Sequence, residues 1–252
     1  MSNYHLEVKT ISRGKGQSVT RSISYITGRK LYDSYLDRTC YNTRSDVLYC
    51  HIFQPSQAPQ KFCDLQLLCN EIERAEIRYD ARTARTFIGS LPNELPLGEW
   101  VEIVRQYITD NFLAHNLCAV AAIHEGLNPH DPARNNPHVH IVVPTRTVTP
   151  EGFHSRKDRE HDKRKYLLLW RERWACVQNQ AYARNALSIT VSHESLAVQG
   201  CQDREPTIHL HRVDWQKEQR GERTAAGDRK RAIQQRNRER DFQYDYEMEL
   251  FP

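Results

Sequence analysis

The stretch Asn136-Pro137-His138-Val139-His140-Ile141-Val142-Val143 sets two histidines two residues apart on a segment typical of a buried β-strand. Because successive strand side chains point to opposite faces, His138 and His140 share one face. A third histidine, His124, ends an earlier apolar run over residues 118–123. If the two runs pair antiparallel across the loop 126–137, the three imidazoles meet at neighbouring strand ends.

Three neutral imidazoles with open coordination positions suit a catalytic divalent metal better than a closed structural site. A His-x-His pair on a strand also occurs as an exposed or hydrogen-bonded pair without a metal. The loop histidine His130 is a spare ligand candidate, although its neighbours Pro129 and Asp131 favour an exposed position. The pattern alone leaves a metal centre and an ordinary histidine pair both open.

The chain of 252 residues is long enough for one large domain, or for one domain with an extension. Hydrophobic residues make up 38% and charged residues 27% of the sequence, so a core can form beneath a very polar surface. The formal net charge of +4 permits an anionic partner without requiring one.

Export and membrane insertion are not expected from the sequence. No run approaches the roughly 20 apolar residues of a membrane span, and the N-terminus lacks a basic-then-apolar signal pattern. Seven cysteines are scattered without a Cys-x-x-Cys pair, which is typical of reduced thiols. We therefore expect a cytoplasmic protein.

Hydrophobic periodicity divides the chain into alternating helices and strands. Strands are predicted at 3–10, 84–91 and 187–192, with the hairpin at 118–144. Helices are predicted at 18–32, 61–81, 97–116 and 166–184, and residues 33–60 are polar and irregular. This order predicts an α+β fold with a mostly antiparallel central sheet flanked by helices.

The composition changes near residue 211, where basic and acidic residues alternate with few large apolar ones. Such a segment is usually a solvated helix, although nucleic-acid contact is an alternative. We predict a catalytic domain over residues 1–210 and, over 211–252, a charged helical extension with an acidic, aromatic tail.

Several short motifs follow one another in a characteristic order. Near the N-terminus they are Tyr4-His5-Leu6, the basic turn from Ile11 to Ser18, and Tyr25 followed by Gly28, Lys30 and Leu31. Farther on they are Ile123-His124-Glu125-Gly126, Asn136-Pro137-His138-Val139-His140 and Trp170-Arg171-Glu172-Arg173-Trp174-Ala175. Each motif is weak alone, but the ordered set, from residue 3 to about 235, resembles the mobilisation relaxases of the MobA/MobL type.

Relaxases of this type are metal-dependent, site- and strand-specific DNA nickases in the histidine-hydrophobe-histidine endonuclease group. The resemblance implies that Tyr25 is the nucleophile and that His124, His138 and His140 hold the metal. It also implies a 5′-phosphotyrosyl intermediate, single-stranded or supercoiled DNA at a plasmid transfer origin as substrate, and accessory mobilisation proteins as partners. Magnesium or manganese is the expected ion, with zinc open because imidazole ligands suit it.

Without the resemblance, the nucleophile could equally be Tyr32 or Tyr35, and Tyr32 would share a helix face with Tyr25. Four basic residues surround Tyr25 in sequence and are candidate DNA-backbone contacts, or else ordinary solvated charges. They are Arg13, Lys15, Arg21 and Arg29.

Two residues depart from the family pattern. Thr86 stands where a glutamate commonly orients a metal ligand or helps to deprotonate the tyrosine, and Ile26 stands where an arginine is usual. The alternative function is therefore an origin-binding protein with impaired chemistry. A zinc-dependent hydrolase of small phosphoesters is a third hypothesis, but it leaves the motifs around Tyr25 unexplained.

Overall fold

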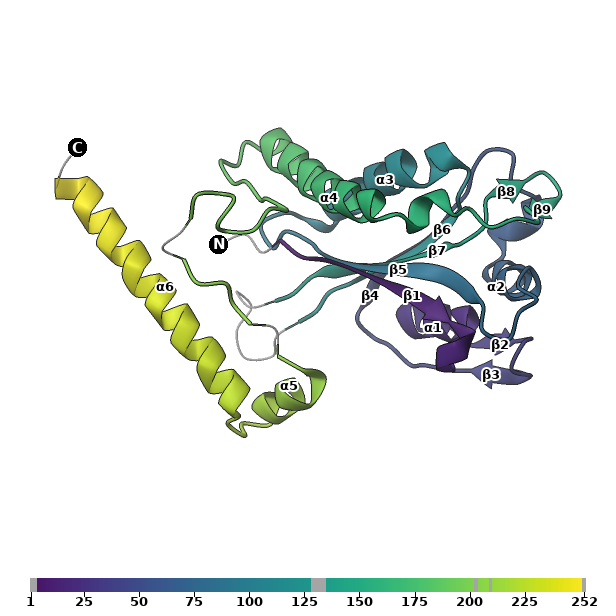
Figure 1. Ribbon diagram of the computed structural model, residues 1–252, viewed down its shortest axis with the longest axis horizontal. Coiled ribbons are helices and arrows are strands. Elements are labelled where there is room, and N and C mark those ends of the chain that lie inside the picture. The colour runs from purple at the N-terminus through teal and green to yellow at the C-terminus, as the bar shows by residue number, and fades with distance from the viewer. Residues whose placement is uncertain (1–3, 128–134, 202–203, 209, 251–252) are drawn as a thin grey trace. The chain divides into compact units, whose positions relative to one another are not determined.

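The computed structural model describes residues 4–127, 135–201, 204–208 and 210–250. Its centre is a five-stranded, fully antiparallel sheet in the order β1-β5-β7-β6-β4 (Figure 1). The strands are β1 (Leu6–Ser12), β4 (Val47–Phe53), β5 (Arg82–Ser90), β6 (Ala119–His124) and β7 (His138–Pro144). The expected hairpin is the β6–β7 pair, so this prediction is confirmed.

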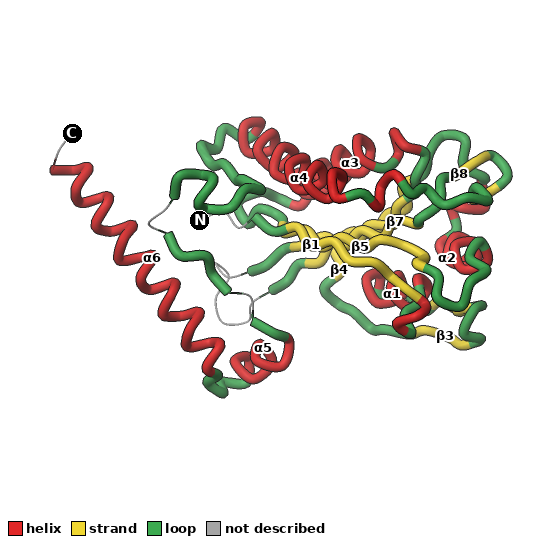
Figure 2. The backbone as a smooth tube through the Cα atoms, in the orientation of Figure 1, coloured by secondary structure: helices red, strands yellow, loops and turns green. Residues whose placement is uncertain are grey.

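Helices cover both faces of the sheet, as Figure 2 shows for the strands drawn in yellow. One face carries α3 (Leu97–Asn111) and α4 (Arg164–Arg184), and the other carries α1 (Val19–Thr27) and α2 (Leu65–Arg74). Two small ribbons accompany them, β2 (Leu31–Asp33) with β3 (Arg38–Cys40) and β8 (Val148–Thr149) with β9 (Gly152–Phe153). Short 3₁₀ turns lie at Arg13–Lys15, Gln60–Cys63, Leu113–His115 and Glu160–Asp162. The predicted α+β class is confirmed.

Alternation along β7 divides the apolar residues between two cores. Val139, Ile141 and Val143 pack in the core that contains α3 and α4. Val142 packs in the second core, with α1 and α2. Because His138 and His140 alternate with Val139, they point to the α1–α2 face of the sheet.

Helix α1 ends earlier than the predicted range of 18–32. Ser18 caps its N-terminus by accepting a hydrogen bond from the Arg21 backbone N–H at 3.1 Å. Gly28 follows the last turn with φ +67°, the left-handed conformation that stops a helix. The chain then continues into β2, so Tyr25 lies in the last turn of α1 and Tyr32 lies on a strand.

Three other predicted elements differ from the structure. The segment 33–60 was expected to be irregular but contains β3 and the edge strand β4, and the helix predicted at 61–81 is the shorter α2. No ladder forms at 187–192. There, the Asn179 side chain replaces a partner strand, since it donates to the Val191 carbonyl at 2.9 Å and accepts from the Val191 N–H at 2.8 Å.

The chain divides into two compact units, residues 1–193 and 194–252. The second unit contains α5 (Arg212–Gln219) and α6 (Ala225–Leu250), joined by Glu218, which accepts from the Thr224 N–H at 2.6 Å and pairs with Arg231 at 2.5 Å. The domain boundary after residue 210 stays a prediction. Among the described residues, no helix is long and apolar enough to cross a membrane.

Candidate active site

Strand register brings the three histidines together. His124 of β6 lies directly opposite His138 of β7, and His140 lies opposite Ala122. The ring centroids are 5.1 Å apart for His124 and His138, 4.7 Å for His124 and His140, and 5.0 Å for His138 and His140. One nitrogen from each ring lies within 4.8 Å of the others, close enough to share one ion. The spare candidate His130 lies outside the described residues.

In His124 and His138, a hydrogen bond to a backbone carbonyl determines which ring nitrogen faces the other histidines. His124 Nε2 lies 2.7 Å from the Ile26 carbonyl oxygen, and because a carbonyl can only accept, Nε2 carries the hydrogen. His124 Nδ1 is buried and has no hydrogen-bond partner among the residues that the structure describes. His138 Nδ1 likewise donates to the Asn136 carbonyl at 2.8 Å, which leaves Nε2 as its free lone pair. Oriented rings with one free nitrogen fit a metal centre.

Burial keeps all three rings in the form that binds metals. Loss of hydration lowers the pKa of His124 to about 4 and that of His140 to about 3, and it also lowers the pKa of His138. The neighbouring rings and the Arg44 guanidinium lower the pKa of His140 further. The imidazoles are therefore neutral at pH 7, as metal ligands must be.

His124 also links α1, the helix that carries the candidate nucleophile Tyr25, to the histidine cluster. Tyr25 is 51% exposed, whereas its neighbour Ile26 is buried in the α1–α2 core. Since the Ile26 carbonyl holds His124, the last turn of α1 is fixed beside the histidines. Tyr25 thus combines an exposed phenol with a backbone anchored at the cluster.

The other candidate tyrosines have partners of their own. The Tyr32 hydroxyl donates to Asp37, and this hydrogen bond is the main reason that the pKa of Tyr32 is raised. Tyr35 packs over the Arg13 guanidinium at 3.6 Å. Neither lies on α1 with Tyr25, so the shared helix face predicted for Tyr32 is not formed.

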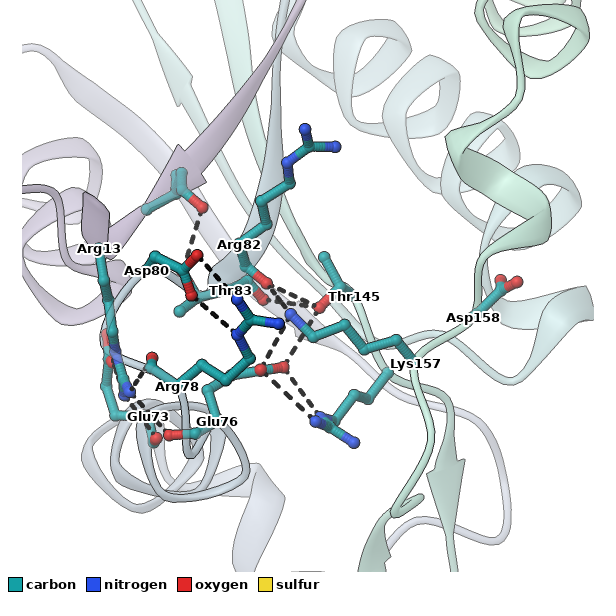
Figure 3. A network of polar contacts seen from close by, with 12 residues as sticks. Arg13, Glu73, Glu76, Arg78, Asp80, Arg82, Thr83, Thr145, Lys157 and Asp158 are labelled. Atoms are coloured by element: carbon teal, nitrogen blue, oxygen red, sulfur yellow. Dashed lines mark hydrogen bonds and ion pairs between the residues drawn. The ribbon is translucent and has the colours of Figure 1, made fainter. Parts of the chain in front are cut away.

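The four basic candidates differ in exposure. Lys15, Arg21 and Arg29 are exposed around α1, and Arg21 shares a helix face with Tyr25 four residues later. Arg13 is 7% exposed, and its guanidinium pairs with Glu73 at 2.7 Å and donates to the Glu73 and Glu76 carbonyls (Figure 3). Because this guanidinium is buried and paired within the fold, it is not exposed where the predicted DNA contact would require it.

Thr86 lies on the face that carries the histidines. On β5 it stands between Lys9 of β1 and Val142 of β7, two residues from Ile88, which is opposite His140. A carboxylate at this position would point beside the cluster, where the threonine supplies no charge.

Arg44 is a functional candidate that the sequence pattern did not indicate. Its guanidinium carbon lies 4.9 Å from the Tyr25 ring centroid. Asp46 holds it with two hydrogen bonds, of 2.8 Å to Nε and 2.6 Å to Nη2. An Arg-x-Asp sequence in a polar segment is too common to have indicated this position.

The fold and the site define a class: a relaxase-type protein with a histidine triad beside a helix-borne tyrosine. Residues 17–220 match the MobA/MobL family, and the chain belongs to this family of mobilisation relaxases.

The chain is 30% identical to the "Probable mobilization protein MobA" of Bifidobacterium longum (strain NCC 2705), over 83% of this chain and 43% of that protein. It is 26% identical to "Mobilization protein A" of Escherichia coli, over 90% of this chain and 32% of the relative. The chain therefore spans less than half the length of these relatives. A solved structure described as "Molecular Basis of Vancomycin Resistance Transfer in Staphylococcus aureus" superimposes with a TM-score of 0.68 at 25% identity, covering 76% of this chain and 98% of that one.

Proposed function

We propose that the chain is a metal-dependent DNA strand transferase that nicks one strand at a plasmid transfer origin during conjugative mobilisation. The observation that carries this proposal is the hydrogen bond from His124 to the Ile26 carbonyl, because it fixes the turn bearing Tyr25 beside the histidine cluster. Family membership supports the same reading. The substrate would be single-stranded or supercoiled origin DNA in the cytoplasm, with accessory mobilisation proteins as partners.

In the proposed reaction, Tyr25 Oη attacks the scissile phosphorus. The Oη–P bond forms, the bond from phosphorus to the 3′-oxygen breaks, and the phenolic proton ends on that oxygen. The products are a 5′-phosphotyrosyl adduct and a free 3′-hydroxyl, so the reverse reaction can rejoin the strand. Lys15, Arg21 and Arg29 would hold the DNA backbone, which positions the strand without reading its sequence.

His124, His138 and His140 would hold the metal. A divalent ion bound there supplies Lewis-acid neutralisation of negative charge on the scissile phosphate. We propose magnesium or manganese, with zinc as the alternative that the imidazole donor set allows.

The alternative function is an origin-binding protein with impaired chemistry, and Thr86 is the observation that favours it. Without a carboxylate at this position, the tyrosine lacks the auxiliary group implied by the resemblance. Efficient adduct formation by the unaltered chain would exclude this alternative.

The decisive experiment uses single-stranded oligonucleotides tiled across DNA that flanks the gene, incubated with Mn²⁺ or Mg²⁺. A denaturing gel would detect covalent protein–DNA species for wild type, Tyr25→Phe and the matched control Tyr41→Phe, an exposed tyrosine. We expect a metal-dependent adduct from wild type and Tyr41→Phe but not from Tyr25→Phe. Tight binding without any adduct would support the origin-binding alternative, and an adduct that persists in Tyr25→Phe would assign another nucleophile.

A further inference from the structure

We propose that Arg44, held by Asp46, forms a phosphate-binding site that positions Tyr25 against the DNA backbone. The inference rests on the proposed function, since it assigns the scissile or a neighbouring phosphodiester as the ligand. It adds a residue from the loop before β4 to a site otherwise built from α1, β6 and β7.

The loop is fixed at both of its sides. The Glu125 N–H donates to the Asp46 carbonyl at 2.9 Å, and Val47, the next residue, lies opposite His124. On the other side, the Asn42 side-chain amide donates to Ser24 Oγ at 3.3 Å. Arg44 is therefore held between the strand that bears His124 and the helix that bears Tyr25.

The Arg44 guanidinium is positively charged and has N–H groups that could donate to a phosphate. Asp46 occupies Nε and one hydrogen of Nη2, so three of the five N–H groups of an arginine fork are not used by this carboxylate. The hydrogen bonds to the Asp46 carboxylate are the main reason that the pKa of Arg44 is raised, so the guanidinium stays charged. The Arg44 side chain retains 17% exposure next to Tyr25, which is 51% exposed.

The neighbouring residue cannot perform this role. Ile26 is buried in the α1–α2 core, so the position after Tyr25 supplies no cation to the surface. Arg44 reaches the same phenol from a separate segment of the chain. A fixed, bidentate guanidinium suits a phosphodiester in shape and charge.

The first test measures DNA binding without metal, so that it does not depend on catalysis. Fluorescence anisotropy would follow a labelled oligothymidylate in EDTA across a salt series, for wild type, Arg44→Gln and Arg105→Gln. Arg105 is the matched control because it forms a similar bidentate pair with Glu102, at 2.9 and 2.5 Å, on α3. Removing one phosphate contact should reduce the slope of log affinity against log salt by about 0.7 in Arg44→Gln alone.

The second test measures single-turnover adduct formation on the oligonucleotide that wild type nicks. We expect Arg44→Gln to lower the rate constant about 100-fold, the range for a lost transition-state donor, and Arg44→Lys to recover part of that loss. Asp46→Asn keeps the Arg44 charge but removes the carboxylate that fixes its guanidinium. We therefore expect slower adduct formation with a nearly unchanged salt slope.

The outcomes separate this inference from the proposed function. A salt slope in Arg44→Gln equal to that of wild type would overturn the phosphate site, even if the adduct slowed. A reduced slope with no adduct from wild type would keep the phosphate site and overturn the nickase function. Equal losses in Arg44→Gln and Arg105→Gln would also reject the site, because the effect would then be one of general surface charge.

Discussion

Each histidine of the cluster can offer one nitrogen to a metal. The Ile26 carbonyl occupies one nitrogen of His124, and the Asn136 carbonyl occupies one nitrogen of His138. His140 completes the set of three. Replacing His140 with alanine should lower metal affinity by more than about 100-fold, beyond the usual loss for an outer-shell partner. Calorimetric titration with Mn²⁺ would measure this, and His51→Ala, on β4 outside the cluster, provides the control. Unchanged affinity would place the metal elsewhere.

The depressed histidine pKa values also predict a pH dependence for the metal-free protein. The unfolded imidazoles bind protons below about pH 6.5. Folded His124 and His140 stay neutral until about pH 4 and pH 3. The unfolded state thus holds more protons in this window, so stability should fall as the pH drops from 6.5 toward 4. Thermal melting in EDTA would show the decline, and His140→Asn should make it shallower. A flat profile in wild type would contradict the buried, neutral cluster.

Thr86 offers a gain-of-function test at the residue scale. Thr86→Glu restores a carboxylate on the histidine face, and we expect adduct formation to accelerate by roughly 10-fold, below the usual range for a fully placed acid or base. Single-turnover assays would measure the change. Thr10→Glu is the control, because Thr10 alternates with Lys9 and Ile11 and so points to the other face of β1. Slower adduct formation by the Thr86→Glu variant would mean that the surrounding residues are adapted to the neutral threonine.

At the scale of secondary structure, the position of Tyr25 depends on where α1 stops. Gly28 has φ +67°, and a Cβ there would lie 3.3 Å from the Arg44 Cβ. Gly28→Ala should destabilise the protein by about 1–2 kcal/mol from the left-handed backbone alone. Gly98→Ala is the matched control: it lies in α3 with open space around it, and should be neutral or stabilising. Urea denaturation would compare the two, and equal effects would argue against strain at Gly28.

The start of α1 depends on a buried ion pair with α2. Glu73 binds Arg13 and also accepts from the Val19 N–H at 2.8 Å, and both side chains are almost fully buried. Glu73→Gln leaves the Arg13 charge unpaired and should cost about 3 kcal/mol. Glu71 lies on the same helix and forms partly exposed pairs with Lys61 and Arg74, so Glu71→Gln should cost less than about 1 kcal/mol. A small effect at Glu73 would show that water or other carbonyls satisfy Arg13.

The hairpin could be predicted from sequence because its information is local. The antiparallel pairing follows from two apolar runs joined by one loop. The alternation of side chains along each strand then places the three histidines on one face of the sheet. Strand β4 was missed because it is an edge strand whose exposed residues, such as His51, obscure the apolar pattern, and its register comes from β6. Arg44 was missed for a related reason, since only tertiary structure brings it to Tyr25. Arg13 shows the converse, because sequence position beside a candidate site does not reveal burial.

At the scale of the molecule, all the proposed catalytic residues lie in the first unit, residues 1–193. This unit also contains both hydrophobic cores of the sheet. The family match extends to residue 220, past the unit boundary, and the relatives are more than twice as long. Truncation at the unit boundary can therefore test which unit binds DNA.

The charge distribution predicts which unit binds DNA. Residues 194–252 carry 11 basic and 12 acidic residues, which leaves 25 basic and 20 acidic residues, a net charge of +5, in the first unit. Several of the basic residues in the second unit are also paired with acids of that unit, including Arg223 with Asp228, Arg231 with Glu218 and Arg236 with Glu205. Removing residues 194–252 should consequently change the slope of log affinity against log salt for oligothymidylate by no more than about 0.7 relative to the full chain, the value of one phosphate contact. Anisotropy would measure it, after cooperative melting has shown that residues 1–193 fold. A larger loss would assign backbone contacts to α5 or α6 despite their internal pairing, and would make the charged helices part of the DNA-binding surface.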